Sequence, residues 1–210
     1  SFKVVQASLA SALDEGIVQV SCAQVQKKNG MKLQDFKLKV MDGKAVLKAG
    51  VDYTVDDTGC TSEMIRAYAD ALGTAGTAPE PKLVLTGIGN YGAKAAEGET
   101  EGGQREISLA GYIYVTKLTA KNLKVEVTGD RTYTGQNTEP TVKVSYYKDN
   151  NAAKQDAVGV ELTEGKDYQV MYGVKNILAG KKKGSITITG AGVYGGSVTV
   201  KFDIEKKTIY

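Results

Sequence analysis

A pattern that occurs twice constrains this chain more than any other feature. The string GVDYTV at residues 50–55 precedes TGIGNYG at residues 86–92, and GKDYQV at residues 165–170 precedes TGAGVYG at residues 189–195. Two distant signatures that recur in the same order are typical of two copies of one fold. A tandem of small β-modules usually positions other regions of a protein and seldom catalyses reactions itself.

Length and composition fit two globular domains. The repeat divides the 210 residues into a predicted first domain, 1–117, and a second, 118–210. Hydrophobic residues make up 41% of the chain and charged residues 24%, so there are enough apolar side chains for two cores and the composition is not that of a disordered chain. Domains of this size fold without metals or many disulfides.

The composition also excludes several kinds of catalytic site. The chain has no histidine, so it lacks a Ser-His-Asp triad, a Cys-His pair and histidine metal ligands. The Gly-x-Gly pairs at residues 87–89 and 190–192 lack a following Lys-Ser or Lys-Thr and precede no predicted helix, so they indicate turns and not phosphate loops. We therefore expect no enzyme, no cofactor and no metal centre.

Charge and hydropathy limit the classes of partner. The net charge of +3 is too small to indicate nucleic-acid binding, and no stretch interleaves basic and aromatic residues. No run of 18 apolar residues occurs, so we expect no membrane insertion. Both ends of the sequence read as boundaries within something longer, which predicts a monomer within a longer multidomain chain.

The second copy has the clearer strand pattern. Apolar and polar residues alternate in short segments separated by turn residues, at 123–127, 141–147, 158–162, 168–172, 185–189 and 197–204. Lys181, Lys182 and Lys183, followed by Gly184, are predicted to form an exposed turn. Several short strands at regular spacing, with no helix, are typical of an antiparallel sandwich.

The first copy follows the same plan with two insertions. Its predicted strands are 17–20, 36–40, 53–55, 82–85, 107–109 and 112–115. Residues 62–72 predict a short amphipathic helix, because Met64, Ile65, Tyr68 and Leu72 fall on one face and Gly73 supplies a stop. The second insertion, 93–103, is acidic and rich in glycine, which predicts a loop or hairpin tip.

Three stretches of the second copy together resemble a known family. They are YTGQNTEPTVKV at 133–144, LTEGKDYQVMY at 162–172 and GSITITGAGVYGGSVTVKFDI at 184–204. They are similar to the bacterial Ig-like repeats of cell-surface, adhesin-like proteins of Gram-positive, often gut-dwelling, anaerobes. The first copy keeps part of this pattern and loses the Tyr-Thr-Gly turn. The resemblance implies an all-β fold of two tandem Ig-like antiparallel β-sandwiches, the first with a short helical insertion.

The resemblance also implies a location and a role. Such modules are extracellular, at the cell surface or associated with the cell wall, and they serve as stalks or spacers without catalysis. The alternative is a carbohydrate- or host-glycoprotein-binding module in which the first domain is the binder. Either hypothesis leaves host or cell-wall glycans or proteins as partners.

The two cysteines, Cys22 and Cys60, lie in the first half of the chain. A disulfide between them would close a long loop and stabilise the fold by about 3 to 4 kcal/mol on chain-entropy estimates. Two buried free thiols are the other interpretation. The sequence leaves both open.

The remaining candidates each have a structural alternative. Asp52, Asp56 and Asp57 suggest calcium ligands, but aspartate beside glycine is also a turn residue. Lysines 181–183 suggest docking of anionic glycans, and the alternative is a solvated turn. An aromatic platform for sugars would use Tyr146, Tyr147, Tyr172 and Tyr194, unless these rings point inward. The acidic run Glu97, Glu99 and Glu101 is a weaker metal candidate than a solvated loop. A Lys–Asn isopeptide crosslink requires a buried lysine.

Overall fold

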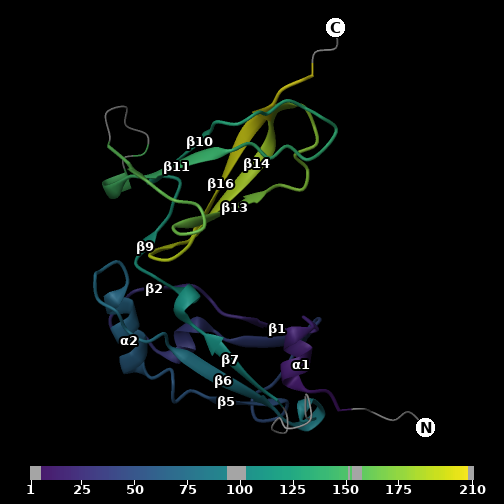
Figure 1. The fold of residues 1–210 in the computed structure, drawn as a ribbon, viewed down its shortest axis with the longest axis vertical. Coiled ribbons are helices and arrows are strands. Elements are labelled where there is room, and N and C mark those ends of the chain that lie inside the picture. The colour runs from purple at the N-terminus through teal and green to yellow at the C-terminus, as the bar shows by residue number, and fades with distance from the viewer. Residues whose placement is uncertain (1–5, 94–102, 151, 153–157, 208–210) are drawn as a thin grey trace, which may run out of the picture. The chain divides into compact units, whose positions relative to one another are not determined.

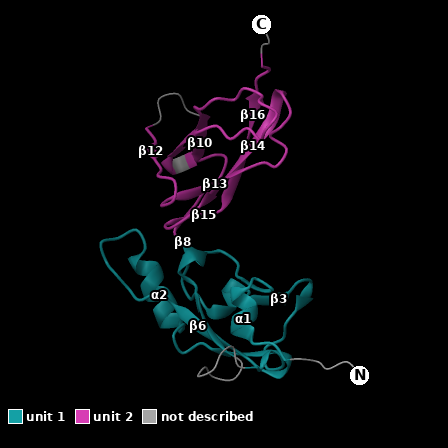
Figure 2. Ribbon diagram, turned by 45° about the vertical axis from the view of Figure 1, so that its right-hand side comes forward, with its two compact units in different colours: residues 1–113 teal, residues 114–210 magenta. Residues whose placement is uncertain are grey.

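The computed structural model describes residues 6–93, 103–150, 152 and 158–207. It divides the chain into two compact units, Ser1–Ile113 and Tyr114–Tyr210 (Figure 2). The division lies four residues before the boundary expected from the repeat. The described fold is predominantly β. No helix among the described residues is both long enough and apolar enough to cross a membrane.

Unit 1 is built from short strands, two α-helices and three 3-10 helices among its described residues. In chain order they are α1 (Leu9–Asp14), β1 (Val18–Ser21), β2 (Val25–Gln26), η1 (Leu33–Phe36), β3 (Lys39–Asp42), β4 (Ala45–Val46), β5 (Tyr53–Asp56), α2 (Ser62–Ala71), β6 (Lys82–Gly87), η2 (Gly89–Tyr91), β7 (Gln104–Ser108), η3 (Ala110–Tyr112) and β8 (Ile113–Tyr114). Two antiparallel sheets have the strand orders β1-β3-β4 and β5-β6-β7, and β2 pairs with β8. The strands β5, β6 and β7 are labelled side by side in Figure 1.

Local sequence explains the central strand and the main helix of unit 1. Strand β6 alternates between half-buried and buried residues, and it places Leu83 and Leu85 in the interior with no exposed surface. Helix α2 begins where the Thr61 side chain accepts a hydrogen bond from the backbone N–H of Met64. Its buried residues are Ile65 and Ala69, which lie four residues apart on one face.

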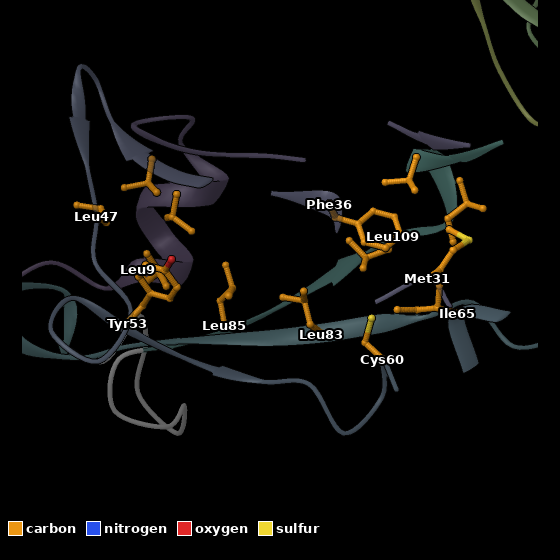
Figure 3. Close-up of a cluster of buried hydrophobic side chains, with 14 of the residues drawn as sticks. Leu9, Met31, Phe36, Leu47, Tyr53, Cys60, Ile65, Leu83, Leu85 and Leu109 are labelled. Carbon is orange, nitrogen blue, oxygen red and sulfur yellow. The ribbon is translucent and has the colours of Figure 1, made fainter. Parts of the chain in front are cut away.

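Both sheets and both helices contribute to the core of unit 1. Val18 and Val40 come from the β1-β3-β4 sheet, and Leu83 and Leu85 from the β5-β6-β7 sheet. Figure 3 shows side chains from the helical segments in the same cluster. They include Leu9, Phe36 and Ile65, none of which has exposed surface. Helix α2 is therefore part of the core and not an appendage.

Unit 2 contains strands and one described 3-10 helix. The elements are β9 (Thr116–Lys117), β10 (Leu123–Val127), β11 (Val142–Tyr146), η4 (Lys148–Asn150), β12 (Val160–Glu161), β13 (Tyr168–Tyr172), β14 (Gly180–Gly190), β15 (Tyr194–Gly195) and β16 (Ser197–Ile204). The antiparallel sheets have the orders β10-β11-β12 and β13-β14-β16, and β15 pairs in parallel with β9.

The core of unit 2 lies between its two three-stranded sheets. Leu123 and Val144 come from one sheet, and Ile186, Ile188 and Phe202 come from the other. Buried residues alternate with half-buried or exposed ones along β14 and β16. This arrangement is sandwich-like, as the alternation in the sequence predicts.

Several sequence-based boundaries are wrong. Helix α1 was not predicted. Residues 36–40 do not form one strand, because Phe36 ends the 3-10 helix η1, Lys37 is left-handed with φ 48° and β3 begins at Lys39. A local hydrogen bond stabilises the 3-10 helix η1, because the Asp35 carboxylate accepts the Lys32 N–H at 2.9 Å. Such side-chain bonds to the backbone compete with strand pairing.

Two further segments also differ from the prediction. Residues 112–115, predicted as a strand, begin at the end of the 3-10 helix η3, and only Ile113–Tyr114 form a strand. The predicted turn at 181–184 lies within strand β14, which starts at Gly180. A register shift between Gly180 and Gly184 lets three lysines fit opposite the end of β16.

Candidate functional site

The aspartates of the repeated signature perform the same task in both units. The Asp52 carboxylate accepts a hydrogen bond from the backbone N–H of Lys48 at 2.8 Å. The Asp167 carboxylate accepts one from the backbone N–H of Thr163 at 2.9 Å. In each case the donor lies four residues before the aspartate, so the side chain closes the turn that leads into the strand.

Backbone hydrogen bonds join the two signatures of each unit. The N–H of Ile88 donates to the carbonyl of Asp52 at 2.9 Å, and the N–H of Ala191 donates to the carbonyl of Asp167 at 2.9 Å. Tyr53 pairs with Gly87 in β5–β6, as Tyr168 pairs with Gly190 in β13–β14. The distant motifs are therefore two halves of one local structure that occurs twice.

Glycine is required in this structure by its backbone conformation. Gly50 has φ 80° and Gly165 has φ 82°, values that L side chains rarely adopt. In the second signature, Gly89 has φ 58°, and a Cβ atom there would lie 2.7 Å from the Val51 carbonyl oxygen. The glycines and aspartates that recur are thus explained by the turn itself and do not indicate a shared binding site.

Two of the three proposed calcium ligands, Asp52 and Asp56, use their carboxylates in the same local way. The Asp56 carboxylate accepts the backbone N–H of Thr58 at 3.0 Å, and this bond lowers the pKa of Asp56. Asp57 is exposed, and its backbone carbonyl accepts the N–H of Cys60. Within the described part of the chain, no group of three acidic or cysteine side chains is placed to hold a metal ion. The candidates Glu97, Glu99 and Glu101 lie outside the described residues.

Both cysteines belong to the core of unit 1. Cys60 is 3% exposed and packs near Leu83 and Ile65 (Figure 3), and Cys22 is half-buried against the same cluster. They are free thiols in this structure. Burial raises the pKa of Cys60 to about 11, with smaller contributions from Asp57 and Cys22, so it is a poor nucleophile at neutral pH. The sequence leaves a bond between Cys22 and Cys60 open, and the intact mass under non-reducing conditions tests for it.

Three of the four tyrosines proposed as a sugar platform, Tyr146, Tyr172 and Tyr194, are inclined to one another or bonded to the backbone. The rings of Tyr146 and Tyr194 are 5.5 Å apart and inclined by 58°. Tyr172 donates its hydroxyl hydrogen bond to the Pro140 carbonyl at 2.8 Å. All three are half-buried and pack against the core. Tilted rings held in this way support the inward-pointing interpretation over stacking on a sugar face.

A buried asparagine holds the connection between β13 and β14. Asn176 is 1% exposed, and its amide donates to the carbonyls of Thr138 and Ser185 at 3.2 and 3.0 Å. Its side-chain oxygen accepts the N–H of Ser185 at 2.8 Å. No lysine in the described part of the chain is buried, so the isopeptide arrangement does not form there.

The lysines of the β14 bulge lie beside a surface hollow of about 460 Å³ in unit 2. Its lining is Gly173, Val174, Lys175, Leu178, Lys182, Lys183, Ser185 and Lys201. Sequence reasoning singled out Lys182 and Lys183 and missed Lys175 and Lys201. The alternation of β16 gave a signal for Lys201, because it precedes the buried Phe202 and must face outward.

No protein-family model matches the chain, and neither a curated protein nor a solved structure matches it. The resemblance to bacterial Ig-like repeats therefore rests on the sequence motifs quoted above. The similarity of the two units to each other is independent of it, because it rests on equivalent hydrogen bonds.

Proposed function

We propose that the chain is an extracellular structural module, a stalk or spacer of a bacterial cell-surface, adhesin-like protein, built from two Ig-like sandwiches. One observation carries this proposal. The same hydrogen-bonded turn, with Asp52 in one unit and Asp167 in the other, occurs in two compact units that each have a core of their own.

The recurring residues support a scaffold because their polar groups are used locally. An aspartate that serves a binding or catalytic site directs its carboxylate toward a ligand, whereas Asp52 and Asp167 accept backbone N–H groups of their own turns. Repetition of such residues repeats a fold and not a reaction.

The strand pairing near the ends of unit 2 suits a module that carries load. Strand β9 pairs in parallel with β15, and Thr132 forms a parallel bridge with Glu205. Two backbone hydrogen bonds accompany this bridge. The N–H of Glu205 donates to the carbonyl of Arg131, and the N–H of Tyr133 donates to the carbonyl of Glu205. The Arg131 guanidinium also forms an ion pair with the Glu205 carboxylate at 3.0 Å. When two paired strands are pulled along their axes in opposite directions, all the hydrogen bonds between them are loaded at once. Such pairing resists separation better than pairing whose hydrogen bonds break one after another.

Single-molecule force spectroscopy on the full chain tests the proposal. We expect two separate unfolding events in each trace, one for each unit. A single event, or gradual extension at low force, would contradict a tandem load-bearing spacer. Arg131→Gln removes the ion pair with Glu205 and should lower the force of the event assigned to unit 2. Arg66→Gln, on the exposed side of α2, is the matched control in unit 1.

The competing hypothesis makes the first domain a binder of carbohydrate or host glycoprotein. An array of neutral glycans and host glycoproteins, probed with the full chain, separates the two roles. Capture that is lost on changing exposed residues of α2, such as Arg66→Glu, would replace the spacer role by a binding role for unit 1.

A further inference from the structure

The lysine hollow of unit 2 gathers positive charge from three separate segments. Lys175 comes from the connection after β13, Lys182 and Lys183 from the bulge of β14, and Lys201 from β16. In the sheet, Ser185 of β14 pairs with Lys201 of β16, so these segments meet at one end of the β13-β14-β16 sheet. The convergence is a product of the fold, since the four lysines span residues 175–201.

These four ammonium groups form no ion pair with a carboxylate in the described part of the chain. The ion pairs found there all use other basic residues, such as Lys124 with Glu126 and Lys143 with Glu161. Asp203 lies next to the bulge, but its carboxylate accepts the backbone N–H of Lys182 at 2.7 Å. Four ammonium groups beside one carboxylate, that of Asp203, leave a net positive charge around the hollow, which attracts an anion.

The walls of the hollow are fixed by hydrogen bonds. Lys182 has φ 54°, and its bond to Asp203 holds the bulge in that conformation. On the other side, the buried Asn176 ties the segment that carries Lys175 to Ser185 of β14. Two independent supports therefore hold the backbone positions of the lysines before any ligand binds, which lowers the entropic cost of binding.

A row of hydroxyl groups continues from the hollow along the outer face of the same sheet. Strand register places Thr187 opposite Thr199 and Thr189 opposite Ser197, on the face away from the core. The Thr187 and Thr199 hydroxyl oxygens are 2.8 Å apart. Two exposed apolar side chains, Val174 and Leu178, add carbon surface at the hollow, with exposed fractions of 88% and 55%.

We propose that this surface binds an acidic polysaccharide, whose sulfate, phosphate or carboxylate groups pair with Lys175, Lys182, Lys183 and Lys201 in unit 2. Sugar hydroxyls then exchange hydrogen bonds with the threonine and serine row. The role goes beyond that of a spacer, because it lets the module attach to an anionic glycan surface. It also differs from the competing hypothesis, which places binding in unit 1.

The lining favours a polysaccharide over a nucleic acid. It contains no aromatic ring and no arginine. Single-stranded nucleic acids are usually bound by stacking of bases on aromatic side chains. Arginine gives oriented, two-pronged contacts to phosphates, whereas lysine is a point charge on a flexible stem. Flexible ammonium groups suit oxyanions that are spaced irregularly along a sugar chain.

The test measures binding of the full chain to immobilised dextran sulfate, with uncharged dextran as the matched polymer. We expect binding to dextran sulfate that weakens as salt is raised, and none to dextran. A triple variant, Lys175→Gln, Lys183→Gln and Lys201→Gln, should lose at least about tenfold in affinity. The control carries Lys121→Gln, Lys148→Gln and Lys166→Gln, three exposed lysines elsewhere in unit 2. It has the same net charge and should lose less than about threefold.

Three results would overturn the proposal. They are no binding of the wild-type chain at low salt, equal losses in the two triple variants, and equal binding of duplex DNA through the same lysines. The second result would mean that only net charge matters. The third would mean that the hollow accepts any polyanion. Because all six lysines are exposed, both variants should fold, and circular dichroism before each measurement confirms it. Failure here would leave the two unfolding events expected of the spacer unaffected.

Discussion

The two units share the turn that contains Asp52 or Asp167, and in each unit a strand follows this turn. The units differ in the crossing, which is the segment that connects this strand to the next strand of the sheet. In unit 1, β5 is connected to β6 through the helix α2, which buries Ile65 and Ala69. In unit 2, β13 is connected to β14 by a short segment held by the buried amide of Asn176. The same crossing is therefore stabilised by an apolar helix face in one unit and by hydrogen bonds in the other.

This difference indicates where such a module can acquire new properties. The turn with Asp52 or Asp167 fixes the start of the strand and the position of the following signature. The segment that connects β5 to β6, or β13 to β14, makes none of these turn hydrogen bonds. Its length and residues can therefore change while the sheet stays intact. In unit 2 the crossing supplies Lys175 to the lysine hollow.

The largest effect is expected from Ile65→Ala in α2. Ile65 has no exposed surface, and removal of a buried isoleucine side chain beyond Cβ costs about 4 kcal/mol of unfolding free energy. The loss should appear only in unit 1. Hydrogen exchange in increasing urea, with peptides from each unit read separately by mass spectrometry, measures it.

Arg66→Ala is the matched control, because Arg66 is exposed on the same helix. It should change the stability of unit 1 by less than about 0.5 kcal/mol. Equal effects of the two variants would contradict the conclusion that α2 is part of the core.

The next effect is the counterpart in unit 2, Asn176→Ala. This change removes the acceptor of the half-buried Ser185 N–H and the donor to the carbonyl of the buried Thr138, while the Ser185 carbonyl keeps the N–H of Gly173. We expect a loss of about 3 kcal/mol, confined to unit 2. Asn137→Ala, at an exposed asparagine bonded to Glu139, is the control and should have little effect. A small loss for Asn176→Ala would mean that water replaces the amide.

Sequence reasoning predicted the strands of unit 2 better than those of unit 1, for a physical reason. Strands β10, β13 and β16 have the predicted bounds, because alternation with a period of two defines a strand in a two-sheet fold. In unit 1, the pattern around Phe36 and Val40 alternates in the same way, yet Phe36 belongs to a 3-10 helix. A short apolar alternation does not distinguish a strand from a turn that buries its last residue.

The amphipathic helix α2 was predicted, but α1 was not. Four apolar residues on one face and the stop at Gly73 mark α2 in the sequence. Helix α1 has only six residues, and its Ser8 cap precedes a stretch too short to show a helical period. Its stability comes from the burial of Leu9 and Ala12 in a core that other segments build.

The lysine hollow shows a different limit of sequence reasoning. Lys182 and Lys183 are adjacent, so the sequence alone shows them as part of a run of positive charge. Lys175 and Lys201 are separated from them by strands and turns, so only the pairing of β14 with β16 and the crossing after β13 bring them close. The two turns with Asp52 and Asp167 differ from the hollow in this respect. Their residues recur in the sequence, so the sequence alone predicts that the two turns have the same structure.

A smaller effect tests whether the two turns are equivalent. Asp52→Ala and Asp167→Ala each remove one carboxylate bond to a backbone N–H, at 2.8 and 2.9 Å. We expect losses of about 1 kcal/mol in unit 1 and in unit 2 respectively, equal within about 0.5 kcal/mol. The asparagine variants keep an acceptor and should recover most of each loss. If the two losses differ by more than about 1 kcal/mol, the turns are similar in geometry only.

An effect no larger than this concerns Tyr91 and Tyr194 of the second signature, which occupy equivalent positions with different partners. Tyr91 donates its hydroxyl hydrogen bond to the Asp42 carboxylate at 2.6 Å, whereas the Tyr194 ring packs against Tyr146. Tyr91→Phe should destabilise unit 1 by about 1 kcal/mol at pH 8. Tyr194→Phe should change unit 2 by less than about 0.5 kcal/mol.

The dependence of the Tyr91 effect on pH gives a sharper test than its size. Burial, and then the hydrogen bond to Asp42, raise the pKa of Tyr91 to about 12 from an ordinary value near 10. Above pH 10 the unfolded chain releases this proton while the folded unit keeps it, so the stability that the hydroxyl supplies falls as pH rises toward 12. The difference in the unfolding free energy of unit 1 between wild type and Tyr91→Phe should therefore become smaller from pH 8 to pH 11. Other tyrosines titrate in both proteins and cancel in the difference, so a constant gap would show that Tyr91 is not bonded to Asp42.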